Sequence, residues 1–141
     1  MHSDGFSAPG AKTVFIVDDD DSVRDLLEFV VAKEGFKIDR AKDGEEALRR
    51  IPEVMPDLII LDLMLPRYGG FEILRQLQAG DTSKIPIVVV TGRYTDRSTS
   101  EMIKQESNVV EFMEKPVKPA ILGALLHTVL KTQPAMPKNP G

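Results

Sequence analysis

Residues 57–66 read Asp-Leu-Ile-Ile-Leu-Asp-Leu-Met-Leu-Pro and are the most informative stretch of the chain. Leu58 to Leu61 are four apolar residues in succession, without the alternation of a strand that has one face in water. Such a run predicts a strand that is buried on both faces, as in the centre of a parallel sheet. The run ends at Asp62, so the predicted strand carries a carboxylate to its carboxyl end, where open α/β sheets place their chemistry.

Similar apolar segments recur along the chain and alternate with segments of helical periodicity. The first helix is the clearest, because positions 23, 26, 27, 30 and 31 are apolar and Gly35 provides a stop. The weakest is the helix at 96–107, in which only Met102 and Ile103 are apolar. Five strands alternating with five helices predict an α/β protein with a parallel sheet, helices on both faces and right-handed crossovers. The strands are expected at 13–17, 36–41, 57–62, 85–91 and 109–115, and the other helices at 43–51, 70–78 and 118–131.

The composition is that of a globular protein with one domain. The chain has 141 residues, 42% hydrophobic and 28% charged, and its net charge of −4 argues against a basic surface for nucleic acid or membrane. Without cysteine there is no disulfide, thiolate zinc site or cysteine nucleophile. No apolar stretch reaches the roughly 18 residues that span a membrane, and the start lacks the features of a signal peptide, so a cytoplasmic protein is expected.

The domain boundaries follow from where the periodic pattern begins and ends. Residues 1–12 show no periodicity and are expected to form a flexible leader. Residues 13–132 are expected to form the domain, and residues 133–141 a disordered, proline-rich tail.

Polar side chains stand where four of the predicted strands end. Carboxyl ends of parallel strands share one edge of the sheet, so these side chains are expected to converge. Three carboxylates at this edge repel one another, and a hard divalent cation with oxygen ligands, Mg²⁺ above all, would relieve the repulsion. With a lysine as a fixed positive charge and a threonine hydroxyl as a donor, the group could hold a phosphoryl group while an aspartate attacks phosphorus. The residues are Asp18 and Asp19 after the first strand, Asp62 after the third, Thr91 after the fourth and Lys115 after the fifth.

Four short motifs, in this order, resemble the receiver domain of two-component response regulators. They are Val-Asp-Asp at 17–19, Leu-Asp-Leu-Met-Leu-Pro at 61–66, Val-Thr-Gly at 90–92 and Glu-Lys-Pro at 114–116. The resemblance covers about residues 12–132. It implies a flavodoxin-like (βα)5 fold, with a doubly wound five-stranded parallel sheet in the order 2-1-3-4-5 and helices on both faces.

The resemblance assigns a role to each acid. Asp62 is implied to take a phosphoryl group from the phosphohistidine of a histidine kinase. Asp18 and Asp19 are implied to hold Mg²⁺, the second directly and the first mainly through water. Asp62 and the backbone carbonyl of Met64 complete the protein ligands. Such a protein catalyses its own aspartyl phosphorylation and dephosphorylation, but it acts mainly as a signalling switch.

The same resemblance implies how the signal leaves the site. Thr91 moves to the phosphoryl oxygen, Lys115 pairs with the same group ahead of a cis bond to Pro116, and Phe112 changes rotamer. The signalling face is formed by the 96–107 helix, the fifth strand and the fifth helix. The expected partners are a sensor histidine kinase or phosphotransfer protein and a downstream output protein, without direct contact to nucleic acid and without membrane insertion. A homodimer through the same face is a further option.

Three other functions compete with this interpretation. A phosphatase of the haloacid dehalogenase class also uses an aspartate nucleophile after a strand, but it needs a second acid where this chain has Met64. A receiver-like module that binds partners without phosphorylation would not need the complete set of acids together with Thr91 and Lys115. A flavodoxin-like cofactor binder would have a phosphate-cradling loop after the first strand, where residues 18–21 are four acids that repel phosphate.

The remaining polar candidates have structural explanations. Asp20 and Asp21 are expected to cap the first helix or to face water. His127 is expected on the polar side of the last helix. Like His2, it has no partner at metal-ligand spacing, so both histidines are predicted to be structural or exposed.

Overall fold

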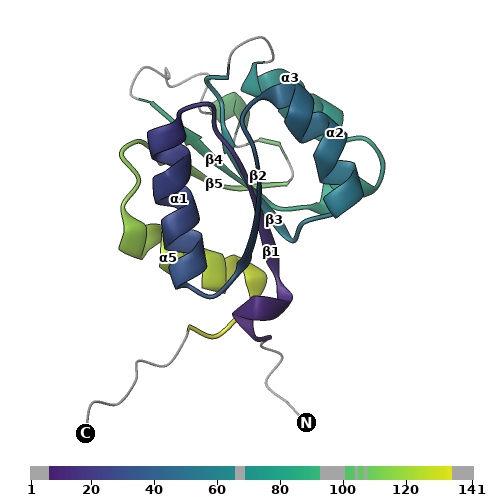
Figure 1. Ribbon diagram of the computed structural model, residues 1–141. Coiled ribbons are helices and arrows are strands. Elements are labelled where there is room, and N and C mark those ends of the chain that lie inside the picture. The colour runs from purple at the N-terminus through teal and green to yellow at the C-terminus, as the bar shows by residue number, and fades with distance from the viewer. Residues whose placement is uncertain (1–6, 66–68, 93–100, 104, 107, 135–141) are drawn as a thin grey trace, which may run out of the picture.

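Five parallel strands form the centre of the computed structural model, which describes residues 7–65, 69–92, 101–103, 105–106 and 108–134 (Figure 1). The strands lie in the order β2-β1-β3-β4-β5, so the predicted sheet and its strand order are confirmed. The strand that ends at Asp62 is the central one, as its unbroken apolar run predicted. The strands span Thr13–Val17 (β1), Lys37–Ala41 (β2), Leu58–Asp62 (β3), Ile87–Thr91 (β4) and Val109–Glu114 (β5).

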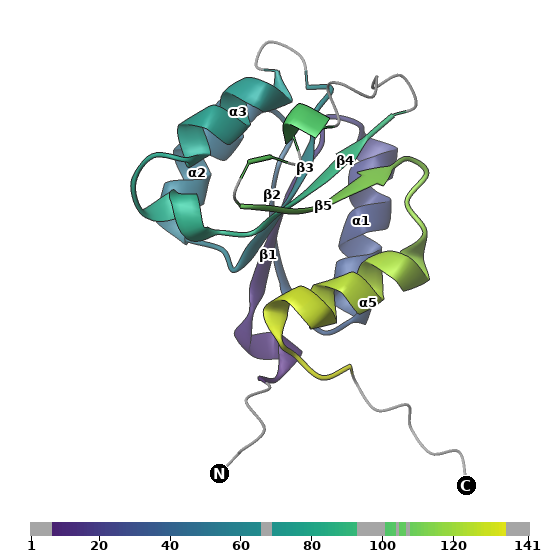
Figure 2. The same ribbon diagram turned by 180° about the vertical axis from the view of Figure 1, so that it is seen from behind.

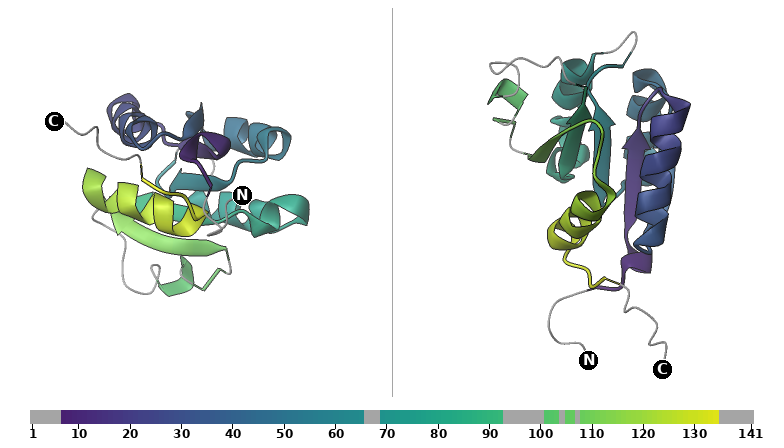
Figure 3. Two further views of the ribbon diagram at one scale, coloured as in Figure 1. Left: turned by 90° about the horizontal axis from the view of Figure 1, so that it is seen from below. Right: turned by 90° about the vertical axis from the view of Figure 1, so that its left-hand side faces the viewer.

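Helices cover both faces of the sheet (Figure 2, Figure 3), with α1 and α5 on one face and α2 and α3 on the other. Of the helix predicted at 96–107, residues 101–103 are helical, whereas 96–100, 104 and 107 lie outside the described residues. Within the described ranges, no helix has the length and apolar character needed to cross a bilayer. The helices span Asp21–Lys33 (α1), Gly44–Val54 (α2), Gly70–Leu77 (α3) and Pro119–Leu130 (α5), with short 3-10 helices at Pro9–Ala11 (η1) and Gly80–Lys84 (η2).

The central strands are uniformly apolar because both of their faces are covered. In β1, Phe15 and Val17 pack toward α2 and α3, whereas Val14 and Ile16 pack toward α1 and α5. All four side chains are fully buried, and burial of each such side chain contributes about 1.5–3 kcal/mol. These two packed layers fix the strands, and with them the positions of the residues at the strand ends.

The ends of the helices follow the expected caps with one difference. Asp20 caps α1 by accepting hydrogen bonds from two backbone N–H groups of the first turn, at 2.8 and 3.1 Å. Asp43 caps α2 in the same way, at 2.8 Å. The helix expected to end at residue 51 continues past Pro52 and ends before Met55, whose φ of 48° is left-handed. A proline in the last turn removes one backbone donor without stopping the helix.

Residues 7–12, which the sequence assigns to a flexible leader, contact the end of α5. The N–H of Ser7 donates to the carbonyl of Lys131 at 3.0 Å, and Ser7 forms an isolated parallel bridge with Thr132. The carbonyl of Lys12 accepts from the N–H of Lys37 at 3.0 Å. These backbone bonds attach residues 7–12 to the amino edge of the sheet. The segment has no periodic pattern from which such pairing could be predicted.

Candidate functional site

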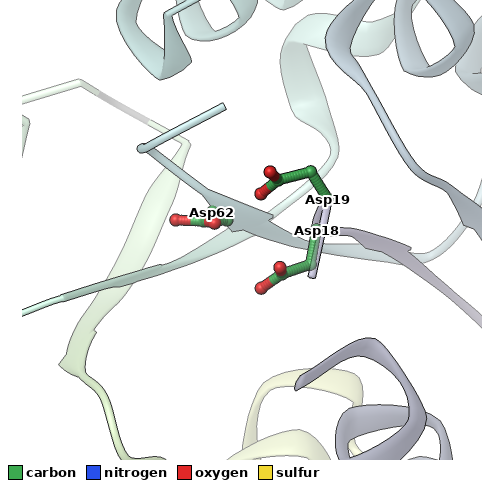
Figure 4. A group of neighbouring side chains, drawn as sticks. All are labelled: Asp18, Asp19 and Asp62. Carbon is green, nitrogen blue, oxygen red and sulfur yellow. The ribbon is translucent and has the colours of Figure 1, made fainter. Parts of the chain in front are cut away.

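Three carboxylates meet at the carboxyl edge of the sheet. Asp18 and Asp19 directly follow β1, and Asp62 is the last residue of β3. Because Val17 is in register with Leu61 on the neighbouring strand, the two strands end at the same level. One oxygen from each carboxylate lies within 4.8 Å of the others, and the three groups point to the same side (Figure 4). Asp18 and Asp62 are buried, whereas Asp19 is exposed.

The ammonium group of Lys115 lies between the two buried acids. Its Nζ is 3.0 Å from Asp18 Oδ2 and 3.2 Å from Asp62 Oδ2. Burial lowers the pKa of Lys115, but the two carboxylates outweigh burial and hold this pKa above its usual value. Lys115 therefore carries a fixed positive charge at neutral pH. It also precedes the expected cis peptide bond to Pro116.

The carboxylate of Asp18 is only partly satisfied by these contacts. Its Oδ1 accepts a hydrogen bond from the N–H of Asp20 at 2.9 Å. Its Oδ2 faces Lys115 as an ion pair, but it is the one buried side-chain oxygen or nitrogen of the described residues without a hydrogen-bond partner. Burial raises the pKa of Asp18, and the neighbouring charge of Asp62 raises it further, against the lowering effect of the Asp20 N–H and Lys115.

This set of donors fits a hard divalent cation. Carboxylate oxygens are the ligands that Mg²⁺ prefers, and the spacing of the three acids allows one cation to contact an oxygen of each. Asp18 Oδ2 is buried and has no hydrogen bond, and its protein contact is the ion pair with Lys115 Nζ at 3.0 Å, so a cation would share this oxygen with Lys115. The residues present therefore fit Mg²⁺.

The other residues singled out in the sequence lie around this cluster. Thr91 ends β4 and is fully buried, and its carbonyl accepts the N–H of Lys115 at 2.7 Å. Met64 is exposed, and its N–H donates to Asp62 Oδ1 at 3.0 Å. Phe112 lies on β5, three residues before Lys115, and packs against the core on the α2 and α3 side. Thr91 and Met64 thus adjoin the cluster, whereas Phe112 is joined to it through β5.

Two features of the site had no sequence signal. Arg24 on α1 donates from Nη1 to the carbonyl oxygen of Asp18 at 2.9 Å. An arginine in the first turns of a surface helix is too ordinary to predict such a contact. A mainly apolar hollow of about 440 Å³ also opens beside Lys115, between α1 and the segment that follows β5. Its lining combines residues more than 80 positions apart: Val23, Leu26, Leu27, Gly92, Lys115, Pro116 and Val117.

Comparison with known proteins gives one consistent result. A family model described as the response regulator receiver domain matches residues 14–127. The transcriptional regulatory protein AfsQ1 of Streptomyces coelicolor is 34% identical over 119 residues, which are 84% of this chain and 51% of that protein. The DNA-binding response regulator MtrA of Mycobacterium tuberculosis is 37% identical over 118 residues, 84% of this chain and 50% of that protein. This chain thus spans about half the length of the curated relatives it matches.

The solved structures agree with the sequence relatives. A CheY-like response regulator receiver domain protein from Methanospirillum hungatei superimposes with a TM-score of 0.77 at 26% identity, covering 85% of this chain and 94% of that one.

Proposed function

Because this chain belongs to the response regulator receiver family, we propose that Asp62 accepts a phosphoryl group from the phosphohistidine of a histidine kinase or phosphotransfer protein. The observation that carries the proposal is the meeting of three carboxylates and one lysine at the carboxyl edge of the sheet. The hollow lined in part by Lys115 supports it further, since it offers a donor protein an apolar surface beside the lysine that pairs with Asp62.

In the proposed reaction, a carboxylate oxygen of Asp62 attacks phosphorus. A P–O bond forms, the P–N bond to the donor imidazole breaks, and the imidazole leaves with the electron pair of that bond. Mg²⁺ held by Asp18, Asp19, Asp62 and the backbone carbonyl of Met64 would supply positive charge that offsets the acids and the phosphoryl oxygens. Lys115 adds a permanent cation at 3.2 Å from Asp62.

We further propose that the phosphoryl group changes the contacts of the residues around it. It makes Asp62 about one charge unit more negative, and the Thr91 hydroxyl and the Lys115 ammonium gain a new partner. The N–H of Lys115 is bonded to the Thr91 carbonyl, so the two residues move as neighbours at the ends of β4 and β5. Phe112 on β5 would carry this change to a face that includes residues 101–103, β5 and α5, where an output protein or a second copy would bind.

Intact mass after incubation with acetyl phosphate or phosphoramidate tests the proposal. The wild-type protein should gain about 80 Da, one phosphoryl group, only when Mg²⁺ is present. The variant Asp62→Asn should gain nothing, whereas Asp25→Asn, at an exposed acid of α1, should behave as wild type. Labelling of Asp62→Asn at another residue would overturn the choice of nucleophile. No labelling of the wild type would favour a module that binds partners without phosphorylation.

A further inference from the structure

We propose that Arg24 is a positioning residue for the metal-binding acids, and that its guanidinium holds the peptide group that aims the Asp19 carboxylate at the cation. This inference rests on the proposed function, because it concerns how the same acids bind Mg²⁺. Arg24 does not touch the reacting atoms. Its hydrogen bond to the carbonyl of Asp18, at 2.9 Å, acts on the backbone that carries the acids.

The orientation of the Asp19 carboxylate depends on the backbone around it. Its side chain is exposed, so core packing does not orient it. The two peptide groups on either side of it are held instead. The carbonyl of Asp18 accepts from Arg24 at 2.9 Å, and the N–H of Asp20 donates to Asp18 Oδ1 at 2.9 Å. Loss of either bond frees one of the two peptide planes that determine where the Asp19 carboxylate points.

The guanidinium is itself fixed in place by acids of α1. Arg24 Nη2 forms an ion pair with Asp21, and its Nε lies 4.0 Å from Glu28 Oε2. Glu28 in turn pairs with Arg40 of β2 at 2.9 Å. The side chain of Arg24 is only 15% exposed, so this arrangement is held by packing as well as by charge. A planar group with several donors can serve the carbonyl and the acids at once, which one ammonium group cannot do.

The positioning role and the charge of Arg24 predict opposite changes in Mg²⁺ affinity when Arg24 is removed. As a positive charge near the acids, Arg24 repels a divalent cation, so its loss would tighten Mg²⁺ binding if charge alone mattered. As a positioning residue it keeps the acids ready for the cation, so its loss should weaken binding. Removal of groups that orient metal ligands typically weakens metal affinity by roughly 10–100-fold.

The test is the Mg²⁺ affinity of the full chain, measured from the rise of the thermal midpoint with Mg²⁺ and, independently, by titration calorimetry. We expect Arg24→Met to bind Mg²⁺ about tenfold more weakly. Its labelling rate by acetyl phosphate should approach that of wild type once Mg²⁺ is saturating. Arg49→Met, at an exposed arginine of α2, is the matched control and should retain wild-type affinity. Arg24→Lys keeps the charge and the aliphatic stem, so its Mg²⁺ affinity should lie between those of Arg24→Met and Arg49→Met. It replaces Arg24→Met in the test if that variant does not fold.

The outcomes separate this inference from the proposed function. Unchanged or tighter Mg²⁺ binding in both Arg24 variants would overturn the positioning role while the wild type still labels at Asp62. A labelling rate that stays low at saturating Mg²⁺ would overturn it too, because the defect would then lie outside metal binding. Absence of labelling in the wild type would instead refute the proposed function itself.

Discussion

Among the described residues, buried polar side chains lie at both edges of the sheet, with His127 at the amino edge and Asp18 at the carboxyl edge. At the amino edge, His127 of α5 bonds through Nδ1 to Thr132 Oγ1 at 2.7 Å and through Nε2 to Glu34 Oε1 at 2.8 Å. Its ring also lies against Phe36, with 5.1 Å between ring centroids. At the carboxyl edge, Asp18 is equally buried, but within the described part of the chain its Oδ2 has no hydrogen bond and is held by an ion pair with Lys115 at 3.0 Å.

The difference separates a structural cluster from the cluster that we propose binds Mg²⁺. Buried polar groups that are hydrogen-bonded hold elements together, and here His127 of α5 is joined to Glu34 at the end of α1 and to Thr132, which follows α5. Buried carboxylates that crowd one another reduce the stability of the fold, and such groups are retained where a ligand compensates for them. Removal of a polar side chain should therefore lower the free energy of unfolding at the amino edge and raise it at the carboxyl edge.

The largest effect is expected at the amino edge. His127→Ala leaves the Thr132 hydroxyl and the Glu34 carboxylate without their partner and removes a ring packed on Phe36. We expect a loss of about 2–3 kcal/mol in the free energy of unfolding. Urea unfolding measures this loss, and Thr128→Ala, which removes an exposed hydroxyl one residue further along α5, is the control. Labelling at Asp62 should survive below the unfolding transition. A cost under about 0.5 kcal/mol, typical of a surface change, would mean that the amino edge is not a structural cluster.

A smaller effect of opposite sign is expected at the carboxyl edge. Asp18→Asn removes a buried charge from the crowded acids, so without Mg²⁺ it should stabilise the fold by on the order of 1 kcal/mol. Part of the gain is offset because Lys115 loses one of its two partners. Thermal unfolding in chelator tests the sign, and Mg²⁺ should raise the midpoint of the wild type much more than that of the variant. Destabilisation of the metal-free protein by Asp18→Asn would erase the contrast between the two edges.

The two edges also differ in how far the sequence predicts them. The sequence could place Asp18, Asp62 and Thr91 at strand ends because each follows an apolar run, and Lys115 because it follows a segment with four apolar residues. Parallel strands bring these ends together. The surroundings of His127 could not be predicted. Its partner Glu34 is 93 residues away, so the helix pattern alone assigned the histidine to a polar face, whereas it is buried. The sequence left two alternatives for His127, structural or exposed. Its contacts agree with the structural one, and the prediction that it lies on a polar face was wrong.

Residues 7–12 and Arg24 escaped sequence analysis for the same reason. Each is held by a hydrogen bond to a backbone carbonyl, since Ser7 donates to that of Lys131 and Arg24 donates to that of Asp18. Any residue provides such a carbonyl, so neither composition nor spacing indicates the contact. Periodicity therefore predicts which elements pack together, and the strand ends predict the acids, but the bonds that aim those acids depend on the assembled structure.

The smallest effect is expected in how the free energy of unfolding depends on pH. The contribution of Asp18, which is crowded by another acid, should fall as pH rises, whereas that of Asp39, which is paired with Arg50, should grow. Burial, the largest influence on Asp18, raises its pKa above 3.8. Between pH 3.8 and that raised value the native state binds more protons than the unfolded state, so the contribution of Asp18 to stability falls as pH rises. Asp39 is also buried in part, which alone would raise its pKa, but the hydrogen bond from Arg50 at 2.7 Å lowers the pKa below 3.8. The stabilising contribution of Asp39 is therefore complete above pH 3.8 and is lost as the pH falls through the lowered pKa of Asp39.

Urea unfolding from pH 2.5 to 6 in chelator should resolve the two contributions. In the plot of the free energy of unfolding against pH, Asp18→Asn should remove a decrease with rising pH above pH 3.8. Asp39→Asn should remove an increase with rising pH below pH 3.8. Asp25→Asn, at an exposed acid, should leave the curve unchanged. If both variants altered the curve on the same side of pH 3.8, the two acids would not differ in the way their contacts imply. The contrast between a crowded and a satisfied carboxylate would then have to rest on metal binding alone.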